Sequence, residues 1–174
     1  MRNWKKVRRI RKDEETISFK SDGTRVFFKF SNVEILTRVI ELQFPDYKSI
    51  LKSAQHDKKI LLNTKDFLSV LKRTLIFVRD NKDSKNGGIF SFENNKLILT
   101  GISENAKIKE ELSTIQEGEN LKISLNVKFL VDYISIIGGK VTELKLLNSK
   151  SSVVVKDEAD DKSVYFTMPL ALRE

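Results

Sequence analysis

One arrangement of strands and helix occurs twice in this sequence, and an internal repeat of this kind constrains the whole fold. The first copy begins with a strand-like run at 58–62, which leads into an amphipathic helix at 64–78. The second begins about 63 residues later, with a run at 121–125 and a helix at 127–137. Both copies therefore have the order β-α-β-β-β. The last three strands are expected at 88–93, 96–103 and 106–113 in the first copy, and at 141–148, 151–156 and 163–169 in the second.

The residue types at the helix ends agree with this assignment. Thr64 and Asn126 are plausible N-caps, because their side chains can accept hydrogen bonds from the first backbone N–H groups of a helix. The second helix is expected to stop at Gly138 and Gly139, since helices often end at glycine.

The region before residue 50 contains a shortened copy of the same unit. Two strand-like runs, 16–20 and 24–30, flank Ser21-Asp22-Gly23, where Asp-Gly favours the positive φ angles of a tight hairpin. A third run covers 33–42, and the segment 2–12 has the spacing of an amphipathic helix. This copy lacks an opening strand, so we expect the chain to begin in the middle of a domain. The alternative is that residues 1–12 are a disordered basic tail.

The positive charge of the chain is concentrated in one segment. The formal net charge is +8, and residues 1–12 hold seven basic groups and no acid. The remaining 162 residues hold 25 basic and 24 acidic groups, so they are nearly neutral. A single basic element of this kind suits contact with phosphates.

The composition excludes several kinds of chemistry. There is no cysteine, which excludes disulfides, thiolate nucleophiles, Fe–S clusters and cysteine-ligated zinc. His56 is the only histidine and has no serine or cysteine at a triad-like spacing, so it is interpreted as a solvated loop residue. The acidic turn at 157–161 has no EF-hand register. We therefore expect no catalytic residue, no metal and no cofactor, and we do not expect an enzyme.

The chain is expected to be soluble and cytoplasmic. No apolar run approaches the roughly 18–20 residues of a membrane span, so no membrane contact is expected. The charged N-terminus has no apolar segment behind it, and the lack of cysteine suits a reducing compartment.

A stiff segment, Phe44-Pro45-Asp46-Tyr47, separates the shortened copy from the two complete ones. Proline fixes its own φ angle and biases the preceding residue toward an extended conformation. The two aromatic side chains can anchor in the flanking cores. From the residues alone, a rigid linker and a segment with a binding role are equally good interpretations.

Four segments, taken in order, resemble the bacterial DNA polymerase III beta subunit family, the processivity sliding clamps. They are Phe44–Tyr47, the helix NVKFLVDYI at 126–134, Ser-Ser-Val at 151–153 and YFTMPLAL at 165–172. Together they span nearly the whole chain, which resembles the C-terminal half of such a subunit. The resemblance implies an α+β DNA-clamp fold, in which antiparallel sheets lie outside and helices line the inner face of a ring.

The resemblance also implies a domain organisation. In this family each chain has three similar domains, each with two copies of the β-α-β-β-β unit, and two chains close head to tail. Residues 1–50 would then be the second half of a middle domain, 51–57 a linker and 58–174 the complete last domain. A homodimer is implied for the full-length protein. The candidate subunit-interface residues are Ile76, Phe77, Ile108, Lys109 and Glu110.

A docking pocket at the chain end is a further implication of the resemblance. In the family it holds short linear motifs with Gln and Leu/Phe, carried by the DNA polymerase III catalytic subunit, the clamp loader and repair proteins. For Met168 and Leu170, ordinary strand packing explains the residues alone equally well. By position, the pocket residues are Pro45, Ile50, Asn126, Phe129, Ser152, Phe166, Thr167, Met168, Pro169, Leu170 and Leu172.

Helices that line the ring would face double-stranded DNA and contact it without sequence specificity. Weak phosphate contacts suit a sliding protein, because strong base readout would hold it at one site. For Lys65 and Lys128 taken singly, a solvated helix face is the simpler interpretation. The DNA-facing candidates are Arg2, Lys5, Lys6, Arg9, Lys65, Lys72, Arg73 and Lys128.

These observations predict a fragment of a replicative sliding clamp that encircles duplex DNA, confers processivity on the polymerase and docks replication and repair partners. Two other functions stay open. One is a basic module that binds DNA or RNA directly through residues 1–12, without encirclement. The other is a protein-interaction domain with no DNA role.

Overall fold

A computed structural model describes residues 17–30, 32–49, 55–79, 86–104, 106–160 and 163–171. The chain divides into two compact units, Met1–Tyr47 and Lys48–Glu174, each of which is described by itself. The division falls three residues before the domain end expected at residue 50. The helix predicted at 2–12 lies outside the described residues.

The first unit contains a three-stranded antiparallel sheet in the order β1 (Ser18–Ser21), β2 (Arg25–Phe30), β3 (Val33–Arg38). The side chain of Asp22 accepts hydrogen bonds from the backbone N–H groups of Thr24 and Arg25 at 3.0 and 2.7 Å, and Gly23 has a φ of 92°. The predicted hairpin at Asp22-Gly23 is thus confirmed. The third strand ends at Arg38 rather than at residue 42, because Arg38 is opposite Arg25, where β2 begins.

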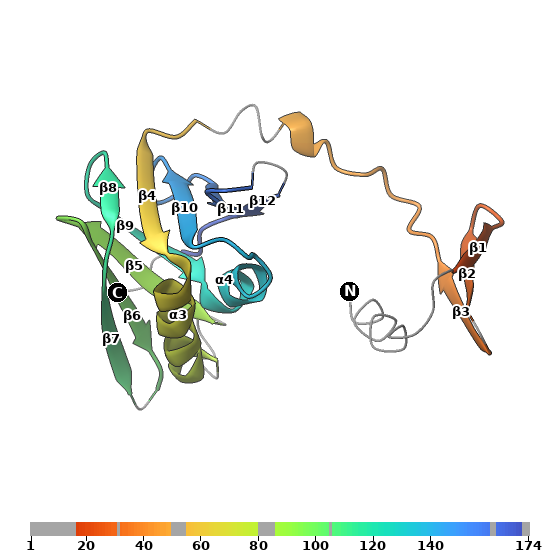
Figure 1. The fold of residues 1–174 in the computed structure, drawn as a ribbon, viewed down its shortest axis with the longest axis horizontal. Coiled ribbons are helices and arrows are strands. Elements are labelled where there is room, and N and C mark those ends of the chain that lie inside the picture. The colour runs from red at the N-terminus through yellow and green to blue at the C-terminus, as the bar shows by residue number, and fades with distance from the viewer. Residues whose placement is uncertain are drawn as a thin grey trace. The chain divides into compact units, whose positions relative to one another are not determined.

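From residue 55 onward, the described part of the second unit contains two antiparallel sheets and the helices α3 and α4 (Figure 1). One sheet has the strand order β12-β11-β10-β4-β8, and the other has the order β7-β6-β5-β9. Among the described residues, neither helix has the length and apolar character that a bilayer crossing requires. The elements are β4 (Lys58–Asn63), α3 (Thr64–Val78), β5 (Gly87–Glu93), β6 (Lys96–Ile102), β7 (Lys107–Ser113), β8 (Ile115–Glu117), β9 (Leu121–Asn126), α4 (Val127–Ile134), β10 (Val141–Leu146), β11 (Val153–Asp157) and β12 (Val164–Thr167).

Each sheet combines strands from both copies of the repeat. The run β5-β6-β7 of the first copy is extended by β9, the opening strand of the second copy. The run β10-β11-β12 of the second copy is extended in the same way by β4, the opening strand of the first. Strand β9 pairs antiparallel with β5, and β4 pairs antiparallel with β10, so each added strand lies beside the first strand of its three-stranded run. The predicted repeat is therefore confirmed, and the two copies exchange their opening strands. Strand β8, at the edge beside β4, was not predicted.

The two helices begin in the same way. The side chain of Asn63 accepts hydrogen bonds from the backbone of Lys65 and Asp66, so Asn63 is the N-cap of α3. The prediction that Thr64 is the cap was wrong. Its hydroxyl is buried and lies 2.9 Å from the hydroxyl of Thr142. Asn126 caps α4 as predicted, because its side chain accepts the backbone N–H of Phe129 at 3.1 Å.

Helix α4 ends at Ile134, three residues before the predicted end. The hydroxyl of Ser135 donates to the carbonyl of Val131 at 2.6 Å. The N–H of Ile136 bonds to the carbonyl of Tyr133, three residues back, at 3.0 Å. Such bonds tighten the last turn, so the regular α-helix stops before the two glycines are reached.

The hydrophobic core of the second unit receives side chains from both helices and both sheets. Phe67 of α3 and Leu130 of α4 are fully buried. So are Phe90 of β5, Leu125 of β9 and Leu144 of β10. Helices α3 and α4 contact one another and lie side by side in Figure 1, as expected if the two copies of the repeat are equivalent.

Candidate functional site

The end of the described chain connects the two sheets of the second unit. Strand β12 pairs with β11, with Thr167 opposite Val153. Beyond β12, the N–H of Leu170 donates to the carbonyl of Ser124 at 2.8 Å, which forms an antiparallel bridge to β9. Because β12 and β9 are edge strands, the segment from Thr167 to Leu170 passes from the edge of one sheet to the edge of the other.

This crossing brings several predicted pocket residues together. Thr167, the last residue of β12, is opposite Val153, which directly follows Ser152. Leu170 is bridged to Ser124, two residues before Asn126 on β9. Phe129 is in the first turn of α4, where its N–H bonds to the side chain of Asn126. We call Asn126, Phe129, Ser152 and residues 166–170 the chain-end surface.

The chain-end surface exposes large apolar side chains. Met168 is 64% exposed and Phe129 is 52% exposed. Phe166, Pro169 and Leu170 are half-buried, whereas Thr167 is buried. Neighbouring exposed apolar side chains with a polar group beside them are typical of a binding surface.

Helix α4 is held against β12 by two tyrosines. The rings of Tyr133 and Tyr165 stack with their centroids 4.8 Å apart and an angle of 16° between their planes. Burial raises the pKa of the Tyr165 hydroxyl. The stacking fixes α4, and with it Phe129, relative to the strand that leads to Met168.

The other three predicted pocket residues fall outside the described part of the second unit. Ile50 and Leu172 lie outside the described residues. Pro45 belongs to the first unit, where its carbonyl accepts the N–H of Tyr47 at 2.8 Å. The rings of Phe44 and Tyr47 meet edge to face with centroids 6.1 Å apart, so this segment forms a compact local turn.

The DNA-facing candidates of the second unit are all exposed, but two of them are already paired. Arg73 donates to both carboxylate oxygens of Glu110 at 2.7 and 2.8 Å and lowers the pKa of that carboxyl. The ammonium group of Lys128 lies 2.6 Å from a carboxylate oxygen of Asp132, which is one turn further along α4. In the described part of the chain, Lys65 and Lys72 make no ion pair. Arg2, Lys5, Lys6 and Arg9 lie outside the described residues.

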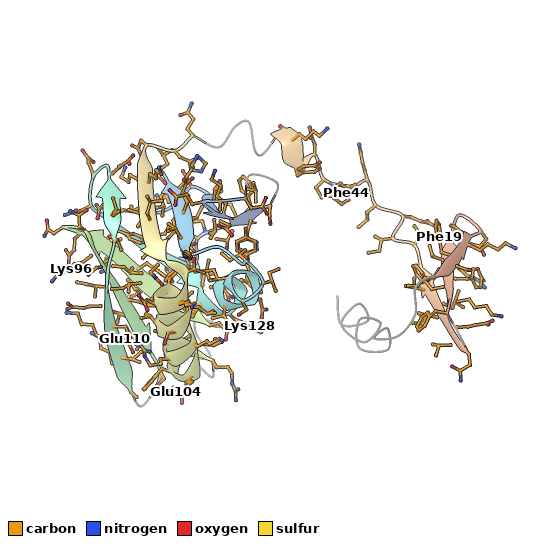
Figure 2. All side chains as sticks on the ribbon, viewed as in Figure 1. Phe19, Phe44, Lys96, Glu104, Glu110 and Lys128 are labelled. Atoms are coloured by element: carbon orange, nitrogen blue, oxygen red, sulfur yellow. The ribbon has the colours of Figure 1, made fainter. Side chains whose placement is uncertain are left out.

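The candidate interface residues lie on α3 and on β7, the edge strand next to it. Ile76 is 74% exposed, and Phe77 is half-buried. Lys109 is exposed, while Ile108 and Glu110 are half-buried. Figure 2 shows Glu110 on β7 and Lys128 on α4; the bond between Arg73 and Glu110 joins α3 to β7.

One cavity was not expected from the sequence. It has a volume of about 390 Å³ and is lined by His56, Asp57, Lys58, Lys59, Glu117 and Lys145. The sequence predicts that His56 is a solvated loop residue, but the side chain is half-buried. Strand pairing brings Lys145 opposite Lys59, and no sequence spacing signals a contact between residues so far apart.

Comparison with known proteins identifies similar chains. Residues 48–171 match the family model of the DNA polymerase III beta subunit, C-terminal domain. The beta sliding clamp of Staphylococcus epidermidis is 26% identical over 160 residues, which cover 90% of this chain and 41% of the relative. The beta sliding clamp of Pseudomonas aeruginosa is 28% identical over 137 residues, which cover 78% of this chain and 36% of the relative. The chain thus spans less than half the length of these relatives.

Solved structures of sliding clamps have the same fold. A DNA polymerase sliding clamp from Pseudomonas aeruginosa matches with a TM-score of 0.78 at 23% identity, over 95% of this chain and 44% of that one. The DNA polymerase III beta subunit of Thermotoga maritima matches with a TM-score of 0.73 at 27% identity, over 92% of this chain and 43% of that one. The DNA-clamp fold expected from the sequence is confirmed. The chain-end surface lies within residues 48–171, which the family model matches.

Proposed function

Because this chain belongs to the DNA polymerase III beta subunit family, we propose that it forms part of a replicative sliding clamp and docks partner proteins at the chain-end surface. The observation that carries this proposal is the position of Met168. It is exposed on the segment that runs from the end of β12 to the bridge with Ser124 of β9, and β9 ends at the cap residue Asn126, with Phe129 in the first turn of α4. A short motif with Gln and Leu/Phe side chains matches this combination of apolar and polar groups.

The two kinds of residue have different roles in docking. Met168 and Phe129 offer apolar area to the Leu and Phe side chains of a motif, and burial of that area provides affinity. Methionine adapts its shape to different partners, which suits a surface that several proteins share. Asn126 is half-buried and held by its bond to Phe129, so its carboxamide provides a fixed polar group that orients the peptide.

Met168→Asp is expected to weaken the binding of a Gln-Leu-x-Leu-Phe peptide by at least about tenfold, because a carboxylate replaces an apolar anchor. Isothermal titration calorimetry measures this change. Ile115→Asp is the matched control, since Ile115 is 63% exposed, Met168 is 64% exposed, and β8 and β12 are opposite edges of one sheet. The control should bind within about twofold of wild type. Equal affinities for both variants would contradict docking at the chain-end surface.

We propose that the ring that contains this chain encircles duplex DNA and gives the polymerase processivity. The exposed Lys65 and Lys72 of α3 support weak phosphate contacts. Encirclement predicts that protein retained on closed circular DNA is released when a restriction enzyme linearises the circle, because the ring can slide off a free end. Pull-down of the DNA before and after cleavage measures retention. Equal retention would instead favour direct binding to nucleic acid.

The remaining parts of this proposal concern partners and location. The polymerase III catalytic subunit, the clamp loader and repair proteins would share the chain-end surface through short linear motifs. A second clamp chain would meet the edge formed by Ile76, Phe77 and β7. The protein would act in the cytoplasm as a non-catalytic subunit, without a cofactor.

A further inference from the structure

The three-stranded sheet of the first unit has one side without charged residues. Phe19 of β1 is opposite Phe28 of β2, and Phe28 is opposite Ile35 of β3. Residues opposite each other in an antiparallel pair lie on the same side of the sheet, and so does every second residue along a strand. We call this side the Phe28 face. It carries Phe19, Ser21, Val26, Phe28, Phe30, Val33, Ile35 and Thr37.

The other side of the same sheet is rich in positive charge. Lys29 and Glu34 form an ion pair there, with Nζ and Oε1 3.1 Å apart. Four of the five charged residues on this side are basic, so it repels a basic segment. They are Lys20, Arg25, Lys29, Glu34 and Arg38.

The Phe28 face is only partly covered. Phe19, which is labelled in Figure 2, is 74% exposed. Phe28 and Ile35 are half-buried, and Phe30 is the only buried residue among the described residues of the first unit. The apolar face of a sheet normally packs against another layer of secondary structure.

The first complete copy of the repeat shows which element covers such a face. Helix α3 precedes the run β5-β6-β7 and contacts all three strands. Phe90 of β5 and Leu99 of β6 are fully buried. A Cβ atom at Gly101 of β6 would lie 2.9 Å from side-chain atoms of both Thr74 and Val78, so α3 lies directly on the sheet. In the shortened copy, the segment with the same place in the chain order is 2–12, outside the described residues.

We propose that residues 2–12 form a helix that docks on the Phe28 face through Trp4, Val7 and Ile10. These three residues lie on one side of a helical projection. The basic residues Arg2, Lys5, Lys6 and Arg9 lie on the other side. The apolar side of the segment thus meets the uncharged face of the sheet, and its basic side points to solvent.

The length and the connection of the segment agree with this position. A helix over 2–12 is about 17 Å long at about 1.5 Å per residue, which is close to the roughly 20 Å of a six-residue strand such as β2. Residues 13–17 join the segment to β1, and five residues reach up to about 17 Å. This is enough for the helix to fold back over the sheet.

Docking would also fix the direction in which the positive charge points. The four basic residues would form one outward stripe, as weak contacts with phosphates require. This consequence rests on the proposed contact with DNA, whereas docking of the segment does not.

Trp4 is the only tryptophan of the chain, so its fluorescence reports docking directly. In the full chain we expect emission at a shorter wavelength than in denaturant, and weaker quenching by acrylamide, because the docked indole is withdrawn from water. Phe28→Asp places a carboxylate in the centre of the Phe28 face and should raise the quenching constant at least about twofold. Leu36→Asp is the matched control, since Leu36 is 56% exposed on the charged side of the sheet.

A second pair of variants leaves the sheet unchanged, so it does not depend on the folding of Phe28→Asp. Val7→Asp should raise the quenching constant as Phe28→Asp does, whereas Arg9→Asp, on the basic side of the segment, should quench as wild type. Equal quenching in Val7→Asp and Arg9→Asp, or wild-type emission equal to that in denaturant, would overturn the proposal.

The emission is also measured at several protein concentrations. We expect the same emission throughout, because docking within one chain does not depend on concentration. A shift that appears only at high concentration would overturn the proposal, since a second copy would then cover the Phe28 face. No DNA is present in these measurements, so they can fail while the proposed clamp function stands.

Discussion

Replacing Phe67 by alanine is expected to lower the free energy of unfolding of the second unit by about 3–5 kcal/mol. Phe67 lies on α3 and is fully buried in the core. Its removal takes a large apolar side chain out of the core and leaves a cavity that the surrounding strands and helices fill only in part. Denaturant unfolding monitored by circular dichroism measures the change.

Ile76→Ala is the matched control for Phe67→Ala. Ile76 is on the same helix but is 74% exposed, so its truncation should change stability by no more than about 0.5 kcal/mol. A loss of stability at Ile76 as large as that at Phe67 would show that α3 does not pack through the face described here.

Gly88→Ala is expected to destabilise the second unit by about 1–3 kcal/mol. Gly88 is on β5, and a Cβ atom at this position would lie 2.6 Å from Cγ2 of Val127 and 3.2 Å from Cδ1 of Leu99. Val127 is the first residue of α4 and follows the cap residue Asn126. The added methyl group therefore pushes against the start of α4, and we expect weaker peptide binding as well as a lower unfolding midpoint.

Gly138→Ala is the control for Gly88→Ala, because a Cβ atom at Gly138 would have nothing within 4 Å. An alanine there restricts the unfolded chain without a clash, so the effect should be neutral or stabilising by up to about 1 kcal/mol. If the two substitutions lowered the unfolding midpoint equally, close packing of α4 against β5 would be contradicted.

The repeat could be predicted from the sequence because its signals are local. The apolar spacing of 64–78 and the cap at Asn126 each lie within a few turns of chain. The exchange of β4 and β9 between the sheets could not be predicted in this way. Both strands are short apolar runs, and nothing in either run specifies which three-stranded partner it joins. Strand β8 has only three residues, which is too few for a clear alternation.

The candidate site was predictable to different degrees. The residues of the chain-end surface were found through resemblance to a family, and only the register of β11 with β12 and the bridge at Ser124 bring them to one place. The charge of Arg73 was evident, but its bond to Glu110, 37 residues away, depends on the packing of α3 beside β7. The cavity at His56 likewise depends on strand pairing and had no local signal.

The measurement that tests the central claim most directly is an NMR titration of the chain with the Gln-Leu-x-Leu-Phe peptide, followed through the backbone amide signals. If the chain-end surface is the docking site of a sliding clamp, the largest shifts should fall on Asn126, Phe129, Met168 and Leu170, and Met168→Asp should abolish them. Saturable shifts that cluster elsewhere in the second unit, or no shifts at high peptide concentration, would contradict it.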